Sequence, residues 1–226
     1  MGGVGQRANS SVMSLALLGG SFDPVHRGHL QSAQELVAQL DCAQLALLPA
    51  AHSPLKDGHC ASAEQRLAML QLGLAEVGNC GGKITVDRRE LDRSGRSYTI
   101  DTVREVRAAI GAERPLYWVI GSDSASHLER WRQWQHLLRY CHLVILSRAE
   151  QPLQCTPTIQ AWLERHQCYK LAQLQTTAAG AVWHCTLSPL PISSTAVRQQ
   201  IASGAPLTGW LPTSVAEYIA THSLYR

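Results

Sequence analysis

The sequence predicts an α/β protein with a Rossmann-like, doubly wound parallel sheet, helices on both faces and a small helical part at the C-terminus. Short, unbroken apolar runs alternate along the chain with longer segments of helical periodicity. Strands that are buried on both faces of a parallel sheet have this composition. The 226 residues, of which 45% are hydrophobic, are also enough for one domain with a substantial core.

The expected strands and helices alternate as far as residue 147. We expect buried strands over residues 14–20, 43–49, 83–87, 115–121 and 141–147. Helical periodicity predicts helices over residues 28–40, 62–77, 99–110 and 131–140. The apolar face of the first helix consists of Leu30, Ala33, Leu36, Val37 and Leu40. Ser62 and Thr99 are candidate N-caps of the second and third helices.

The two ends and one internal segment depart from this alternation. Residues 1–13 are rich in Gly and Ser and have no apolar signal-peptide region, so we expect a flexible tail before a single domain over residues 14–226. Residues 148–185, rich in Gln, Thr and Pro, are expected to form an irregular insertion. Residues 192–226 predict two short helices, each started by Ser or Thr.

Composition restricts the partners and the compartment. A net charge of +3 gives no concentrated basic face of the kind that nucleic-acid binding needs. No apolar run reaches the roughly 20 residues of a membrane span. The seven cysteines form no C-x-x-C pair and are odd in number, which indicates a reduced, cytoplasmic protein without a structural zinc site. The oligomeric state is open, and a homo-oligomer is compatible with the sequence.

The segment GGSFDPVHRGHL, which follows the first strand, has the features of an anion site. Gly19 and Gly20 let a ligand approach the backbone closely. A helix then begins near Gly28, with N–H groups and a positive dipole end that favour an anion. His26 and His29 can both face that anion. Metal binding, phosphate binding and packing are the alternatives for this pair; the lack of further metal ligands and the preceding glycines favour phosphate.

The segment PISSTAVRQQI near the C-terminus is a second candidate anion site. Ser193 or Ser194 can cap the helix that follows, which is the structural interpretation of such a pair. Arg198 lies one turn later, so hydroxyl groups, backbone N–H groups and a guanidinium gather at one helix start. With the first segment, this predicts a polyphosphate held between two helix N-termini. The sequence has neither a dinucleotide-binding G-x-G-x-x-G at the first strand nor a P-loop.

These two segments resemble the motifs of the nucleotidyltransferase superfamily. GGSFDPVHRGH is similar to the signature G-x-F/T-D-P-x-H-x-G-H, and ISSTAVR is similar to I-S-S-T-x-x-R. Four further stretches, RSYTIDT, IGSDS, LERWRQW and LYR, resemble bacterial nicotinate mononucleotide adenylyltransferases. The resemblance extends from Leu15 to Arg226. It implies transfer of the adenylyl group of ATP to nicotinate mononucleotide, with deamido-NAD and pyrophosphate as products, in NAD biosynthesis.

The resemblance also implies roles for particular residues. The catalytic set is His26, His29 and Arg198, with the histidines at the α-phosphate and Arg198 at the leaving pyrophosphate. The residues implied in ATP binding are Gly19, Gly20, Ser21, Phe22, Lys56, Gly121, Asp123, Ile192, Ser193 and Ser194. Those implied in nicotinate mononucleotide binding are Tyr98, Thr99, Trp131 and Arg132. Mg²⁺ is the implied cofactor, held mainly by the phosphates of ATP, with no metal site of the protein's own.

Several of these residues have a structural alternative. Asp123 can instead cap a turn, Trp131 can be a half-buried aromatic at a helix start, and Lys56 can be a solvated loop residue. One loop departs from the family pattern: in PAAHSPLK, Leu55 stands where the family usually has His, and His52 lies three residues earlier. The alternative functions are an adenylyltransferase that uses nicotinamide mononucleotide or phosphopantetheine, and a non-catalytic nucleotide-binding protein.

Overall fold

The structure, a computed structural model, describes residues 13–51, 60–147, 153–188 and 190–226. Its centre is a sheet of six parallel strands in the order β3-β2-β1-β4-β5-β6. The strands are β1 (Leu15–Gly20), β2 (Gln44–Pro49), β3 (Ile84–Val86), β4 (Leu116–Gly121), β5 (His142–Ser147) and β6 (Val182–Thr186). The predicted α/β class with a doubly wound parallel sheet is therefore confirmed.

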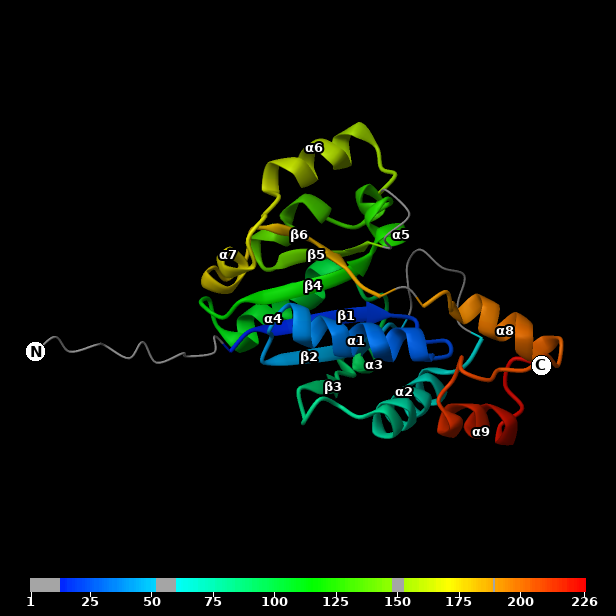
Figure 1. The fold of residues 1–226 in the computed structure, drawn as a ribbon. Coiled ribbons are helices and arrows are strands. Elements are labelled where there is room, and N and C mark those ends of the chain that lie inside the picture. The colour runs from blue at the N-terminus through cyan, green and yellow to red at the C-terminus, as the bar shows by residue number, and fades with distance from the viewer. Residues whose placement is uncertain (1–12, 52–59, 148–152, 189) are drawn as a thin grey trace, which may run out of the picture.

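Helices cover both faces of this sheet (Figure 1). Between the strands up to β5 lie α1 (Arg27–Gln39), α2 (Ala63–Val77), α3 (Arg89–Asp92), α4 (Thr99–Ile110) and α5 (Ser122–Ala125), with the 3-10 helices η1 (Leu128–Arg130) and η2 (Trp134–Arg139). After β5 come α6 (Pro157–His166), α7 (Leu171–Thr176), α8 (Ser194–Ala202) and α9 (Thr213–Thr221). In the described part of the chain, no helix is long and apolar enough to cross a membrane.

Successive residues of the central strands point into two different cores. In β4, Tyr117 and Val119 belong to the core that also contains residues of α1, α2, α8 and α9. Leu116, Trp118 and Ile120 belong to the core on the other face, which contains residues of α4 and α6. None of these five side chains is more than 6% exposed. A strand buried on both faces needs apolar residues at every position, which is why these strands are unbroken apolar runs in the sequence.

All five predicted strands and the first three predicted helices form, with ends within one residue of the expected ones. The predicted apolar face of α1 is buried. Ser62 caps α2 as expected, because its Oγ accepts a hydrogen bond from the backbone N–H of Gln65 at 3.2 Å. The side chain of Gln65 in turn accepts from the N–H of Ser62 at 2.9 Å, which completes a capping box.

Two predicted segments differ from the structure. Residues 131–140 were expected to be one α-helix, but only the 3-10 helix η2 forms there, because Gln133 is left-handed with φ 52° and separates it from Trp131. Residues 148–185 were expected to be irregular, but their described part contains α6, α7 and most of β6, the sixth strand of the sheet. In β6 only Val182 and Cys185 are buried, so this edge strand carries a weak apolar pattern.

Both predicted C-terminal helices form. The Oγ of Ser193 caps α8 by accepting a backbone N–H of the first turn at 3.1 Å. Helix α9 begins at Thr213 after Pro212, which supplies no side-chain cap. The carboxylate of Glu76 in α2 accepts the backbone N–H groups of Thr213 and Ser214 instead, at 2.9 and 2.7 Å. These bonds hold α9 against α2, beside the C-terminus (Figure 1).

His142 in β5 is fully buried, and both of its ring nitrogens are hydrogen-bonded. Its Nδ1 accepts the backbone N–H of Ala181 at 3.1 Å, so Nε2 carries the proton and donates to the carbonyl of Thr177 at 2.8 Å. Burial lowers the pKa of His142 below its usual value, and burial also lowers the pKa of His184 in β6. The folded chain therefore favours the neutral form of both rings.

The free energy of unfolding is expected to fall as the pH drops below about 6.5. At such a pH, His142 and His184 bind protons in the unfolded chain, whereas folding lowers their pKa and opposes this protonation. Each histidine contributes a slope of at most about 1.4 kcal/mol per pH unit. Urea unfolding between about pH 7.5 and 5.5 measures this loss. The variant His142→Gln does not titrate here and should show a smaller pH dependence; a dependence as steep as that of the wild type would contradict the expectation.

Candidate active site

A cavity of about 760 Å³ lies at the carboxyl ends of β1 and β4. These neighbouring strands are the switch point of the sheet, because β2 and β3 extend it on one side and β5 and β6 on the other. Ligands of open parallel sheets bind in the crevice at such a point. The lining residues at or just after the strand ends are Gly19, Gly20, Ser21, Ala50, Gly121, Asp123 and Ser124. The ends of β1, β2 and β4 therefore meet at one edge of the sheet.

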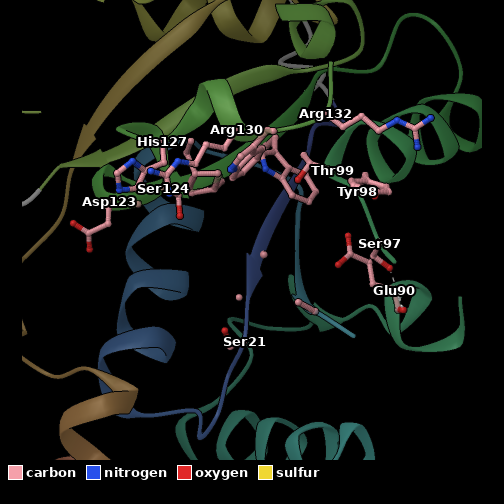
Figure 2. A pocket seen from close by; sticks show the side chains of 18 residues that line it. Ser21, Glu90, Ser97, Tyr98, Thr99, Asp123, Ser124, His127, Arg130 and Arg132 are labelled. Atoms are coloured by element: carbon pink, nitrogen blue, oxygen red, sulfur yellow. Dashed lines mark hydrogen bonds between the residues drawn. The ribbon is translucent and has the colours of Figure 1, made fainter. Parts of the chain in front are cut away.

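The remaining walls of the cavity come from α3, the start of α4 and the segment around η1. They are formed by Glu90, Ser97, Tyr98, Thr99, His127, Arg130, Trp131 and Arg132. Trp118, Val119 and Ile120 of β4 also line the cavity. Figure 2 shows Asp123, Ser124 and His127 on one side of the cavity, and Glu90, Ser97 and Tyr98 on the other. Five residues implied in ATP binding thus line the same cavity as all four residues implied in mononucleotide binding: Gly19, Gly20, Ser21, Gly121 and Asp123. The described residues Phe22, His26, His29, Ile192, Ser193, Ser194 and Arg198 do not line it.

The loop after β1 is built around two glycines and a buried aromatic ring. A Cβ atom on Gly20 would lie 3.0 Å from the ring of Phe22, and one on Gly28 would lie 3.1 Å from Nδ1 of His26, so a side chain at either position would force its neighbour to move. Phe22 is 1% exposed and its ring packs edge-on against His29 at 5.0 Å. The side chain of Phe22 therefore supports His29, and only its backbone is left to meet a ligand.

The two histidines of the H-x-x-H pair cap α1 reciprocally. The N–H of His29 donates to Nδ1 of His26, and the N–H of His26 donates to Nδ1 of His29, both at 3.3 Å. Their rings are stacked at 3.6 Å, and His26 is 4% exposed. Because each Nδ1 is an acceptor, the neutral rings carry their protons on Nε2. The two histidines can therefore have a structural role and a phosphate-binding role at once. Nδ1 of each ring stabilises the helix start, and Nε2–H of each ring is a hydrogen-bond donor.

Helix α8 meets this loop with its N-terminal turn. The Oγ of Ser194 donates to the carbonyl of Pro24 at 2.9 Å, and Nη1 of Arg198 donates to the carbonyl of Asp23 at 2.7 Å. The structure thus brings the two candidate anion segments together, although they are far apart in sequence. Ile192 is 8% exposed and its Cβ lies 3.8 Å from a Cβ built on Gly28, so its side chain is a packing contact between α1 and α8.

The start of α4 opens into the cavity without a side-chain cap. The N-cap position is Tyr98, not Thr99 as expected, and no side chain of the described residues bonds to the first N–H groups there. Tyr98 is extended, with φ −105° and ψ 137°, so the chain enters the helix directly at Thr99. Uncapped N–H groups at the positive end of a 12-residue helix can donate hydrogen bonds to an anion.

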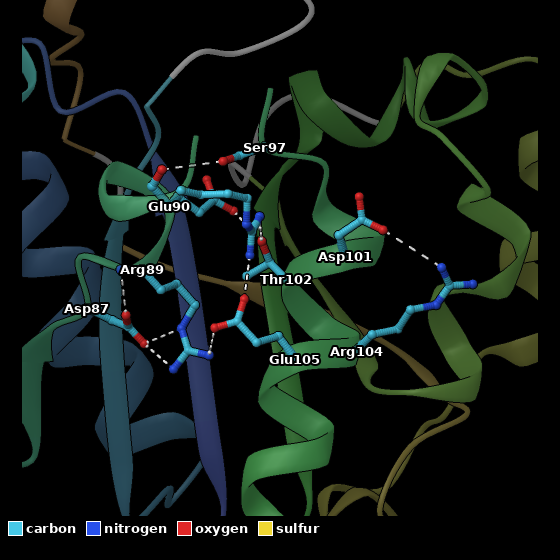
Figure 3. Close-up of polar contacts among 9 residues, drawn as sticks. Asp87, Arg89, Glu90, Ser97, Asp101, Thr102, Arg104 and Glu105 are labelled. Carbon is cyan, nitrogen blue, oxygen red and sulfur yellow. Dashed lines mark hydrogen bonds and ion pairs between the residues drawn. The ribbon is translucent and has the colours of Figure 1, made fainter. Parts of the chain in front are cut away.

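A network of ion pairs and hydrogen bonds holds α3 and the following segment against α4 (Figure 3). Oε1 of Glu90 accepts the hydroxyl of Thr102 at 2.7 Å, and Arg93 donates to that hydroxyl at 3.0 Å and to Glu105 at 2.6 Å. Arg89 pairs with Glu105 at 3.3 Å. Burial raises the pKa of Glu90, and the hydrogen bond from Thr102 opposes that rise. The network places the start of α4 at the cavity.

The predicted mononucleotide residues form one side of the cavity. The guanidinium of Arg132 lies over the ring of Tyr98, 5.0 Å from its centre, and pairs with Asp101 at 3.7 Å. Trp131 is half-buried and follows η1 in an extended conformation, so it is not at a helix start. Trp134 instead packs edge-on against Trp162 at 5.0 Å and does not line the cavity. Both tryptophans are partly buried against the same core, but only Trp131 lines the cavity.

One predicted residue lies outside the described part of the chain, and five polar lining residues were not predicted. Lys56 belongs to the segment 52–59 that the structure does not describe. Asp123 is exposed at the cavity, and α5 has no side-chain cap, so the turn-capping alternative for this residue is not observed. The polar lining residues that the sequence did not single out are Glu90, Ser97, Ser124, His127 and Arg130. Three of them lie within the family-like stretches quoted above, whereas Glu90 and His127 had no such signal.

The side chains around the cavity fit a metal ion that is bound mainly by the phosphates of a substrate. Among the described residues, no group of three or more His, Cys, Asp or Glu side chains is placed to hold a metal ion. Asp123 is one exposed carboxylate at the edge of the cavity. Mg²⁺ is typically bound by one or two carboxylates together with substrate phosphates and water.

Comparisons with known proteins agree with this geometry. Residues 17–200 match the family model described as cytidylyltransferase-like, which is more than half of the chain. A protein of Cellvibrio japonicus (strain Ueda107), named probable nicotinate-nucleotide adenylyltransferase, is 39% identical over 94% of this chain and 99% of its own. A protein of the same name from Serratia proteamaculans (strain 568) is 40% identical over 93% of this chain and 94% of its own.

Solved structures with little sequence identity share the fold. Plasmodium falciparum nicotinic acid mononucleotide adenylyltransferase, complexed with NaAD, superposes with a TM-score of 0.72 at 15% identity, over 94% of this chain and 97% of that chain. The same protein complexed with APC gives a TM-score of 0.67. The family match, the two relatives and the cavity at the switch point lead to one conclusion: the chain belongs to the nicotinate-nucleotide adenylyltransferases, within the cytidylyltransferase-like family.

Proposed function

We propose that this chain transfers the adenylyl group of ATP to nicotinate mononucleotide. A phosphate oxygen of the mononucleotide attacks the α-phosphorus of ATP in line, the bond from that phosphorus to the bridging oxygen breaks, and pyrophosphate leaves. The product is deamido-NAD. The observation that carries this proposal is the gathering of the H-x-x-H pair, the start of α8 and the cavity around the single loop that follows β1. Phosphoryl-type transfer needs positioning and charge stabilisation, and it needs no protein nucleophile.

The histidine pair provides donors for the α-phosphate. Since Nδ1 of His26 and of His29 both accept backbone N–H groups, each neutral ring has its proton on Nε2. Two stacked rings with this tautomer can direct both N–H groups at oxygens of one phosphate. A donor that is held in place before the reaction stabilises the charge that builds up on the pentavalent phosphorus without reorganising.

Helix α8 provides the site for the leaving pyrophosphate. A guanidinium has five N–H groups, and the two hydrogen bonds of Arg198, to Asp23 and Thr195, use two of them. The remaining N–H groups and the positive end of α8 can hold the β- and γ-phosphates. The hydroxyls of Ser193 and Ser194 already serve the cap and the contact with Pro24, so these residues support the site rather than supply its charge.

The start of α4 provides the site for the nicotinate carboxylate. Its first N–H groups have no side-chain cap and face a cavity that Trp131 and Arg132 also line. A helix N-terminus favours an anion, so a carboxylate is preferred here to the neutral carboxamide of nicotinamide mononucleotide. Trp131 stacks on the pyridine ring. These features favour nicotinate mononucleotide over the alternative acceptors.

Mg²⁺ would be held mainly by the phosphate oxygens of ATP and would neutralise part of their charge. In this chain, Asp123 is the exposed carboxylate at the cavity that would hold such an ion, directly or through water, whereas Glu90 is buried and bonded to Thr102.

Release of pyrophosphate from Mg-ATP tests the function directly. Nicotinate mononucleotide, nicotinamide mononucleotide and phosphopantetheine are supplied in turn as acceptors. We expect release with nicotinate mononucleotide and a much lower kcat/KM with the other two. No release with any acceptor would exclude an adenylyltransferase and favour a binding protein, whereas preference for nicotinamide mononucleotide would contradict the role proposed for the start of α4.

Substitution of Trp131 by alanine is expected to raise the KM for nicotinate mononucleotide by about tenfold, because a stacked ring and the apolar area under it are lost. The KM for ATP should change little, since Trp131 belongs to the segment after η1 and not to the loop after β1 that is proposed to receive ATP. Steady-state kinetics with each substrate varied in turn measure both constants. Trp134→Phe, outside the cavity, is the matched control. Equal increases for both substrates would contradict the assignment of Trp131.

A further inference from the structure

The carboxylate of Asp23 is the buried centre of the loop between β1 and α1. Asp23 is 4% exposed. Its Oδ2 accepts the backbone N–H of Cys60 at 2.7 Å, and its Oδ1 accepts that of Ala61 at 3.2 Å, just before α2. Oδ1 also accepts the hydroxyl of Tyr225 at 2.7 Å, across 202 positions of sequence. The second-to-last residue of the chain is thus bonded directly to the loop that carries the H-x-x-H pair.

The carbonyl groups of the same loop are bonded to two other elements. The carbonyl of Ser21 accepts from Nη1 of Arg66 in α2 at 2.7 Å, and the carbonyl of Asp23 accepts from Arg198 in α8 at 2.7 Å. Arg66 is 1% exposed, and burial lowers the pKa of its guanidinium while the nearby charge of Asp23 opposes that effect. The loop is therefore held between α2, α8 and the C-terminus, and the bond to Asp23 is the contribution of Tyr225.

The surroundings of Tyr225 favour its hydrogen bond to Asp23. Its ring packs against the core formed by α1, α2, α8 and α9. Its backbone is left-handed, with φ 64°, which a non-glycine residue adopts only at a cost. Burial and the hydrogen bond to Asp23 both raise the pKa of Tyr225, so its hydroxyl stays protonated and donates. The hydrogen bond to Asp23 offsets the free-energy cost of the left-handed backbone and of removing the hydroxyl from water.

We propose that Tyr225 is a positioning residue for the ATP site, which acts through Asp23 on the loop that presents Ser21, His26 and His29. The inference rests on the proposed function, because it assigns this loop to ATP. Loss of the Tyr225 hydroxyl removes one hydrogen-bond donor from the buried carboxylate of Asp23. Such a carboxylate binds a water molecule or shifts until it finds another donor. Because Asp23 lies three residues before His26, that shift reaches the phosphate-binding groups and not the start of α4.

Comparison of Tyr225→Phe with Tyr218→Phe tests this inference. Tyr225→Phe keeps the ring and loses only the hydroxyl. Tyr218→Phe removes a hydroxyl from α9, and the ring of Tyr218 stacks on His222. Mg-ATP affinity by calorimetry, both KM values and the thermal midpoint are measured. For Tyr225→Phe we expect an increase of about fivefold in the Kd and KM for ATP, with an unchanged KM for nicotinate mononucleotide. Tyr218→Phe should match the wild type in both constants.

Two results would overturn the inference. The first is a Tyr225→Phe variant that binds Mg-ATP as tightly as the wild type while its thermal midpoint falls, since that describes a structural role only. The second is equal weakening of both substrates. If the wild type released no pyrophosphate, the proposed function would fail, and the calorimetric affinity for Mg-ATP would still decide whether Tyr225 acts on the ATP site.

Discussion

Removal of either imidazole of the H-x-x-H pair is expected to lower kcat by at least about tenfold, because transition-state charge on the α-phosphate loses a positioned donor. The reciprocal cap at the start of α1 complicates the choice of variant. Alanine at His26 or His29 removes a cap bond as well as the donor, and loss of a cap costs about 1 kcal/mol of stability. A lower kcat in an alanine variant would therefore result from the lost donor, the lost cap bond or both.

Two conservative variants separate these effects. Asparagine is a preferred N-cap residue, so His26→Asn keeps an acceptor for the N–H of His29 and loses Nε2–H. Glutamine is a standard residue at the third helical position of a capping box, so His29→Gln keeps an acceptor for the N–H of His26. We expect both variants to have a lower kcat and an unfolding free energy within about 0.5 kcal/mol of the wild type. An unchanged kcat in either variant would assign that histidine to the cap alone.

Substitution of Arg198 by alanine is expected to lower kcat/KM for ATP by about 100-fold, which is the usual effect of losing one preorganised charge contact in a transition state. The guanidinium is proposed to hold the leaving pyrophosphate while it donates to the carbonyl of Asp23 at 2.7 Å. Arg198→Lys retains the charge and loses the planar fork, so it should recover only part of the activity.

The control for Arg198 is Gln199→Ala, an exposed neighbour on the same helix. It should retain wild-type kinetics. Steady-state rates with ATP varied, together with thermal unfolding, distinguish the proposed role from a structural one. If Arg198→Ala lost stability and kept its kcat/KM for ATP, the contact with Asp23 would be its whole contribution.

The regular elements near the start of the chain could be predicted because their signals are local. The strand Leu15–Gly20 is a continuous apolar run, and the helix Ala63–Val77 has both its apolar pattern and its Ser62–Gln65 capping box in the sequence. The helix expected over residues 131–140 failed because one left-handed residue, Gln133, interrupts it. Nothing in the side chain of glutamine signals that conformation. The edge strand β6 was missed because only two of its five residues are buried.

The candidate site was predictable to the extent that it consists of contiguous motifs. GGSFDPVHRGHL and ISSTAVR each contain a helix start together with its polar groups, and both starts form where expected. The cavity residues Glu90 and His127 lie outside such motifs and were not found. The sequence predicts Thr99 as an N-cap, whereas in the described part of the chain no side chain caps that helix start. Its first N–H groups are therefore better suited to bind a carboxylate.

By itself, the sequence determined the α/β class, the position of the H-x-x-H pair at a helix start and the presence of a second anion segment, because periodicity and capping act over a few residues. Only the tertiary structure decided that α8 contacts the loop after β1 and that Tyr225 bonds to Asp23. These contacts join residues up to 202 positions apart. Their geometry depends on how the helices pack on the sheet, and no local pattern records it.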